Sequence, residues 1–169
     1  MKYPIRTRIL HWLTAIAIFA TLLIGFTMTN LIGSHGTLVA VHMTLGVSIL
    51  AIVIARAANR FTHKTPPLPN TVGPWEAKLV VGSELSLYAL MLAQPLVGWA
   101  MVSASGTPVR VFGGVALPRI APFDADLFAI LRQGHSVLAY LLVAAVAAHV
   151  SAVLLHTLTL RDRMLRRML

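Results

Sequence analysis

Three long stretches without a charged side chain constrain the fold of this chain more than any other feature. Asp, Glu, Lys and Arg are absent from residues 9–55, 85–109 and 133–160. A helix crosses a bilayer core with about 20 apolar residues, so the first stretch has room for two spans and each of the others for one. Overall, 57% of the residues are hydrophobic and 11% are charged, whereas about a quarter are charged in a soluble domain. The sequence therefore predicts an integral membrane protein.

The expected architecture is all-α, an up-and-down bundle of four transmembrane helices. We expect these helices at about residues 9–29, 38–58, 76–102 and 135–160. The connections are too short to hold a second core, so residues 1–169 are expected to form a single domain. The longest connection, residues 103–134, is expected to be a loop with a functional or lid-like role.

The placement of the basic residues predicts how the bundle is oriented. The net charge is +9, and all but three of the 14 lysines and arginines fall on the side of the membrane that holds both termini. Positive charge concentrates in cytoplasmic segments, so we expect both termini of this membrane protein to lie in the cytoplasm. Because topology and contact with lipid explain the charge, a nucleic-acid partner is not expected. The three exceptions are Arg110, Arg119 and Arg132.

The basic start ahead of an apolar run also fits a signal peptide. The run over residues 9–28 is long for the apolar part of such a peptide and has no convincing small-residue cleavage site. We therefore expect this segment to be a transmembrane helix.

Histidines are the candidate ligands of this chain. Of seven histidines, five fall within or at the ends of the predicted spans, where ionisable groups are costly and tend to be functional. A single intramembrane histidine is as often a hydrogen-bonding partner between helices as a ligand, so their relative depth has to decide. The five are His11, His42, His135, His149 and His156.

Four of these histidines match in pairs by their depth in the membrane. His11 lies near the inner end of the first helix, whereas His42 and His135 lie near the outer ends of the second and fourth. His149 is 14 residues beyond His135, which places it about 21 Å deeper on nearly the same face. We therefore expect an outer pair, His42 with His135, and an inner pair, His11 with His149.

Paired histidines between helices suit haem better than zinc. Haem iron takes one imidazole on each face, and the porphyrin fills an apolar slot between helices. A closed zinc site needs about four nitrogen or sulfur ligands, and the chain has no cysteine. Small residues beside the histidines would leave room for a macrocycle, or they reflect ordinary close helix packing; they are Gly46, Gly134, Ala145 and Ala148. The sequence predicts two haems b.

Five segments together resemble the bacterial cytochrome b561 family of di-haem membrane proteins, and within it the superoxide:ubiquinone oxidoreductase type. They are RILHWLTAIAIF, VHMTLGVSILAIVIAR, TPPLP, LYALMLAQPLVGW and RQGHSVLAYLLVAAVAAHVSAVLLH, in this order. The resemblance implies a multi-pass protein of the bacterial inner membrane, with haem ligation by His11 with His149 and by His42 with His135.

One position departs from the family pattern. Where the family often has a histidine near the start of the third helix, this chain has Glu84. Glu84 could act as a proton carrier, pair with a nearby cation, or reach from within the membrane to the interface.

The resemblance also implies substrates at the two ends of the bundle. Arg110, Arg119 and Arg132 could attract superoxide or an acidic redox protein on the periplasmic side, or they pair with Asp124, Asp126 and lipid phosphates. On the cytoplasmic side, the resemblance implies a ubiquinone site near His156, Trp75 and Lys78. Alternatively, His156 and Trp75 are ordinary interfacial residues.

The expected function is superoxide oxidation coupled to ubiquinone reduction, which would make the protein an oxidoreductase. The alternative is a non-enzymatic cytochrome b subunit that relays electrons between quinol and a periplasmic redox partner. A third alternative, a proton or metal transporter that uses the histidines, predicts that no haem is bound.

Overall fold

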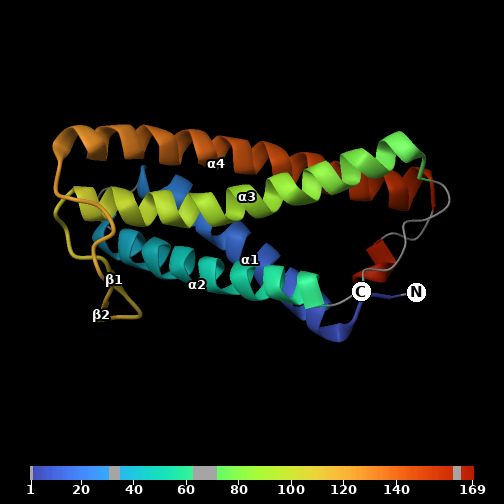
Figure 1. Cartoon of the computed structure of the whole chain (residues 1–169), viewed down its shortest axis with the longest axis horizontal. Helices are drawn as coiled ribbons and strands as arrows, with labels where there is room; N and C mark the ends of the chain where they lie inside the picture. The colour runs from blue at the N-terminus through green and yellow to red at the C-terminus, as the bar shows by residue number, and fades with distance from the viewer. Residues whose placement is uncertain (1, 31–34, 63–71, 162–164) are drawn as a thin grey trace.

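The fold is a bundle of four long helices with a small hairpin at one end (Figure 1). The computed structural model describes residues 2–30, 35–62, 72–161 and 165–169. The TPPLP segment, Lys64 and His63 lie outside the described residues. In chain order the elements are α1 (Ile5–Met28), α2 (His35–Thr62), α3 (Pro74–Ala104), β1 (Arg110–Val111), β2 (Val115–Ala116) and α4 (Ala125–Leu154), followed by a π-helical turn (Leu155–Thr159) and a short 3-10 turn (Leu165–Arg167).

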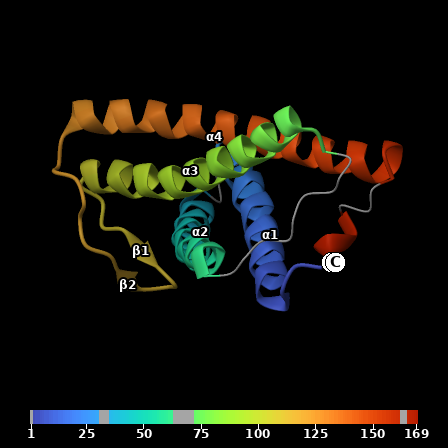
Figure 2. The same cartoon turned by 45° about the vertical axis from the view of Figure 1, so that its right-hand side comes forward.

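Within the described residues, four helices are long and apolar enough to cross a membrane, which confirms the four-helix architecture. α1 is the shortest at 24 residues, about 36 Å, and therefore exceeds the thickness of a bilayer core. Each helix packs against the next in the chain, and the first two helices are inclined to the last two (Figure 2). Both termini lie at one end and the hairpin at the other (Figure 1).

The helices extend beyond the charge-free stretches from which they were predicted. α1 begins at Ile5 and α2 begins at His35, which had been expected in a loop. The error is largest for α4, which begins at Ala125 and not near residue 135. The absence of charge marks only the part of a helix inside the hydrocarbon core, whereas the helix itself continues into the headgroup layer.

A thin core holds the bundle together. Its buried members come from all four long helices: Ile18, Ile49, Val53, Met91 and Leu142. Many large apolar side chains point outward instead; Phe26 is 75% exposed and Leu23 67% exposed. This distribution is expected when lipid, not water, surrounds the helices.

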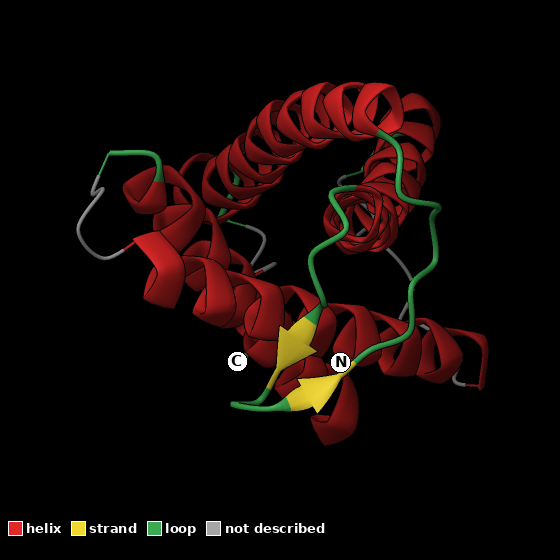
Figure 3. Ribbon diagram, turned by 90° about the vertical axis from the view of Figure 1, so that its left-hand side faces the viewer, coloured by secondary structure: helices red, strands yellow, loops and turns green. Residues whose placement is uncertain are grey.

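The connection between α3 and α4 is an ordered cap on the end of the bundle. Val109 and Val111 are almost fully buried, and the Phe112 N–H donates to Thr44 Oγ1 of α2 at 3.2 Å. The Trp99 indole of α3 donates to the carbonyl of Pro118 at 2.9 Å. Seen end-on, the hairpin lies against the end of the helices (Figure 3). The expected loop of residues 103–134 is therefore shorter and more structured than predicted.

Candidate functional site

The structure brings His42 of α2 and His135 of α4 together near the hairpin end. Their ring centroids lie 6.2 Å apart, and the ring planes meet at 80°. The Nδ1 atoms of both rings are buried without a hydrogen-bond partner. His135 lies ten residues inside α4, which begins at Ala125, so this outer pair is within the bundle and not at the helix end where the sequence had placed it.

Two glycines allow the helices to approach the outer pair. A Cβ atom on Gly25 of α1 would lie 3.1 Å from His42 Cε1, and one on Gly98 of α3 would lie 2.9 Å from His135 Cε1. Each histidine ring therefore rests against a neighbouring helix where a side chain is missing. At Gly46 and Gly134, which the sequence had suggested, a Cβ would meet nothing within 4 Å.

Gln94 of α3 is a neighbour of the outer pair that sequence reasoning missed. Its amide nitrogen donates to the backbone carbonyl of His135 at 3.1 Å and lies 3.4 Å from His135 Nε2. Its amide oxygen is buried without a partner. The sequence signal that could have identified Gln94 is a polar glutamine inside a charge-free stretch, next to Pro95 in the same helix.

His11 of α1 and His149 of α4 form a second pair toward the end of the bundle that holds the termini. Their ring centroids are 6.4 Å apart and the planes meet at 57°. The Trp12 ring meets His11 edge-on at 5.5 Å. Fourteen residues of α4 separate His135 from His149, which corresponds to about 21 Å along the helix.

The ring-centroid spacing of both pairs matches that of two imidazoles bound to opposite sides of one iron. An imidazole nitrogen binds a metal ion at about 2.0–2.1 Å and lies about 1.1 Å from its own ring centroid, so centroids on opposite sides of one ion are about 6.3 Å apart. The two pairs lie at 6.2 and 6.4 Å. Among the described residues, no group of three or more His, Cys, Asp or Glu could hold a metal ion. Each pair offers two imidazoles, the number that a haem iron with two axial histidines takes.

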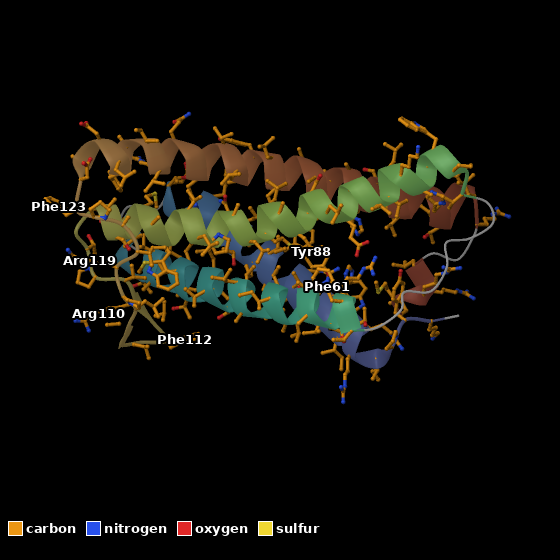
Figure 4. All side chains as sticks on the ribbon, viewed as in Figure 1. Phe61, Tyr88, Arg110, Phe112, Arg119 and Phe123 are labelled. Carbon is orange, nitrogen blue, oxygen red and sulfur yellow. The ribbon has the colours of Figure 1, made fainter. Side chains whose placement is uncertain are left out.

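Polar side chains gather beside the inner pair. The Arg56 guanidinium donates to His11 Nδ1 at 3.1 Å and lies over the Tyr88 ring, 5.3 Å from its centroid; Figure 4 shows Tyr88 between α2 and α3. Arg60 Nε donates to Glu84 Oε1 at 3.0 Å. Of the alternatives for Glu84, the structure shows pairing with a cation.

The residues expected around a quinone lie at the same end of the bundle. Lys78 Nζ lies 5.9 Å from the centroid of the Trp75 ring, and His156 lies on the π-helical turn that follows α4. A shallow groove on α3 is lined by Lys78 and by Ala77, Val81, Gly82 and Leu85.

No ion pair with a carboxylate is seen for the three arginines at the hairpin end within the described part of the chain. Arg110 lies on β1, and Arg119 donates to the carbonyl of Gly106 at 2.9 Å; both are labelled in Figure 4. Arg132 lies on α4 and not in a loop as predicted. Asp124 caps α4 by accepting from the Leu127 N–H at 2.8 Å. Of the alternatives for these arginines, pairing with Asp124 and Asp126 is not seen among the described residues.

Comparison with known proteins agrees with the architecture. Residues 2–169 match the family model described as prokaryotic cytochrome b561. A protein named probable superoxide oxidase CybB from Yersinia pestis is 28% identical over 129 residues, which cover 76% of this chain and 73% of that protein. Cytochrome b561 homolog 2 of Escherichia coli K12 is 27% identical over 175 aligned positions, which span 99% of this chain and 91% of that protein. Because the family model spans nearly the whole chain, this protein belongs to the prokaryotic cytochrome b561 family of haem-binding membrane electron-transfer proteins.

Proposed function

We propose that the chain, as one transmembrane domain of residues 1–169, binds two haems b and conducts electrons across a bacterial inner membrane. His42 and His135 would hold the outer haem, and His11 and His149 the inner one. The observation that supports this most is the spacing of the two pairs, 6.2 and 6.4 Å between ring centroids. Haem iron, when bound, exchanges single electrons between its ferric and ferrous states.

The protein's own residues would set the environment of both sites. Gly25 and Gly98 leave room for the rings of His42 and His135, and the Gln94 amide fixes the backbone beside His135. The buried core residues on all four helices would keep water out of the space between the sites. Ligand orientation and burial are the means by which a protein tunes such a cofactor.

We propose that the termini face the cytoplasm and the hairpin faces the periplasm. In the structure both termini share one end of the bundle (Figure 1). Most lysines and arginines belong to segments at that end, as the positive-inside rule requires of cytoplasmic segments.

At the periplasmic end, the proposed substrate is superoxide. Arg110, Arg119 and Arg132 lack carboxylate partners in the described residues, so their charge is available to attract a small anion. The relative from Yersinia pestis carries the name probable superoxide oxidase, which agrees with this choice.

At the cytoplasmic end, the proposed acceptor is ubiquinone, bound near Trp75, Lys78 and His156. The apolar groove along α3 beside Lys78 suits an isoprenoid-substituted ring, and a lysine or histidine can donate to a quinone carbonyl. Two superoxide anions would each lose one electron to become dioxygen. Ubiquinone would take both electrons and two protons to become ubiquinol.

Rapid mixing of the purified, oxidised protein with superoxide tests this proposal. We expect reduction of the haem absorption bands at a rate near the diffusion limit, followed by reoxidation when ubiquinone is added. If superoxide leaves the spectrum unchanged while ubiquinol reduces it, the protein is an electron relay to a periplasmic partner. A preparation without any haem absorption would contradict both functions.

A further inference from the structure

Two arginines lie one helical turn apart near the cytoplasmic end of α2, and only one of them has a counter-charge. Arg60 is paired with Glu84 of α3 at 3.0 Å. Arg56 contacts the neutral His11 ring and the Tyr88 ring. No carboxylate is paired with Arg56 in the described part of the chain. Arg56 is the first charged residue after the charge-free stretch 9–55 of the chain, and its guanidinium has no counter-charge among the described residues.

The contact between Arg56 and His11 is incompatible with iron binding by that histidine. A guanidinium group can only donate hydrogen bonds, so His11 Nδ1 must accept from Arg56 at 3.1 Å. A neutral imidazole that binds iron through Nε2 carries its hydrogen on Nδ1, and it donates from there to an acceptor. If iron bound through Nδ1 instead, the same lone pair would be used. In either case Arg56 must leave His11 when iron binds.

We propose that Arg56 then binds a propionate carboxylate of the inner haem. This inference rests on the proposed haem site between His11 and His149. Haem b has two carboxylates on the edge of its ring, and a guanidinium group binds a carboxylate through two parallel hydrogen bonds. Arg56 is the cation of the described residues that touches a ligand of this site.

The neighbours of Arg56 support this role. The centroid of the Tyr88 ring lies 5.3 Å from the guanidinium carbon of Arg56. This cation–π contact can stabilise the guanidinium group after it separates from His11. Glu84, the nearby carboxylate, is occupied by Arg60 and does not compete for Arg56. Replacing Arg56 by lysine would keep the charge but lose the planar, two-pronged geometry.

The test is an infrared redox difference spectrum combined with a redox titration. Both are recorded on protein carrying haem with carbon-13-labelled propionates, in a His42→Leu background that leaves the inner haem alone. In Arg56→Gln we expect the label-sensitive carboxylate bands to shift and the midpoint potential to fall, because a nearby cation favours the electron-rich ferrous form. Arg56→Lys should keep most of the potential and still shift the bands.

The double variant Arg60→Gln, Glu84→Gln is the matched control. It removes an arginine one turn away together with its counter-charge, and should leave bands and potential unchanged. Unshifted bands in Arg56→Gln, with or without a change of potential, would overturn the inference. A potential that stays constant or rises would do the same. Loss of haem from the parent protein would instead contradict the proposed function, before Arg56 is altered.

Discussion

Gly98 of α3 determines how closely the ring of His135 can approach that helix. A Cβ at this position would lie 2.9 Å from His135 Cε1, a distance at which the ring has to move. Ligands of a haem must be held within narrow limits of position and angle, so a displaced ring weakens the site. At the residue scale, the proposed outer haem site therefore depends on the absence of one methyl group at Gly98.

We predict that Gly98→Ala lowers the occupancy of the outer haem and alters its absorption spectrum. Gly82→Ala is the matched control on the same helix, because a Cβ there meets nothing within 4 Å. Haem content per chain and the reduced-minus-oxidised spectrum report the result. Full occupancy with an unchanged spectrum in Gly98→Ala would show that the ring of His135 is not a ligand in this orientation.

Replacing either histidine of the outer pair should empty one site only. His42→Leu and His135→Leu each remove one of two rings whose centroids are 6.2 Å apart, whereas the inner pair lies about 21 Å away along α4. We expect haem content to fall from two per chain to one in both variants. The control is His35→Ala, which removes a ring hydrogen-bonded to the carbonyl of Met28 at 3.0 Å. This variant should retain both haems. The pairing is wrong if either leucine variant keeps two.

Depth along a helix can be counted from the sequence, but rotation about its axis cannot. The pairing of His42 with His135 and of His11 with His149 followed from residue counts and the direction of each span. The neighbours Gly98, Gln94 and Arg56 were missed, because which face a helix turns to its partner depends on packing along its whole length.

At the scale of elements, the start of α4 shows why a charge-based boundary was ten residues late. Asp124, Asp126 and Arg132 made this segment resemble a loop. In the structure the Asp124 side chain accepts from the Leu127 N–H at 2.8 Å and so caps α4. An acidic residue at this position accepts a hydrogen bond from an otherwise unpaired backbone N–H group, and its negative charge interacts favourably with the positive end of the helix dipole. The hairpin of β1 and β2 was missed because strands of two residues leave no alternating pattern.

We predict that Asp124→Ala destabilises the protein by about 1 kcal/mol, the usual value of a helix N-cap. Thermal unfolding in detergent, monitored by the release of haem, would show a lower midpoint temperature for Asp124→Ala than for the unaltered protein. Asp126→Ala lies in the first turn but makes no cap, and should have a smaller effect. Equal midpoints for Asp124→Ala and the unaltered protein would mean that α4 is held by the bundle alone.

At the scale of the whole molecule, charge is distributed unevenly between the two ends. Three arginines without carboxylate partners in the described residues lie at the hairpin end, whereas the other described lysines and arginines belong to segments at the opposite end. The three charge-free stretches were sufficient to predict the four-helix bundle, because a membrane leaves few alternatives to a helical bundle. The tilt between the helix pairs could not be predicted, since it depends on side-chain contacts across the core.

We predict that the triple variant Arg110→Gln, Arg119→Gln, Arg132→Gln slows haem reduction by superoxide about tenfold, at the lower end of the range for electrostatic steering. The salt dependence of the rate should also weaken, because exposed charges are screened. Replacing Lys2, Arg161 and Arg166 by glutamine removes the same charge at the opposite end and should leave the rate unchanged. Equal rates for both triple variants would exclude steering by the hairpin end.

The number of haems per chain tests the central claim most directly. Protein purified from cells with ample haem supply should give a pyridine haemochrome spectrum of haem b with two haems per chain, measured against amino-acid analysis. One haem per chain would contradict the model of two histidine pairs, and a colourless preparation would contradict haem binding altogether.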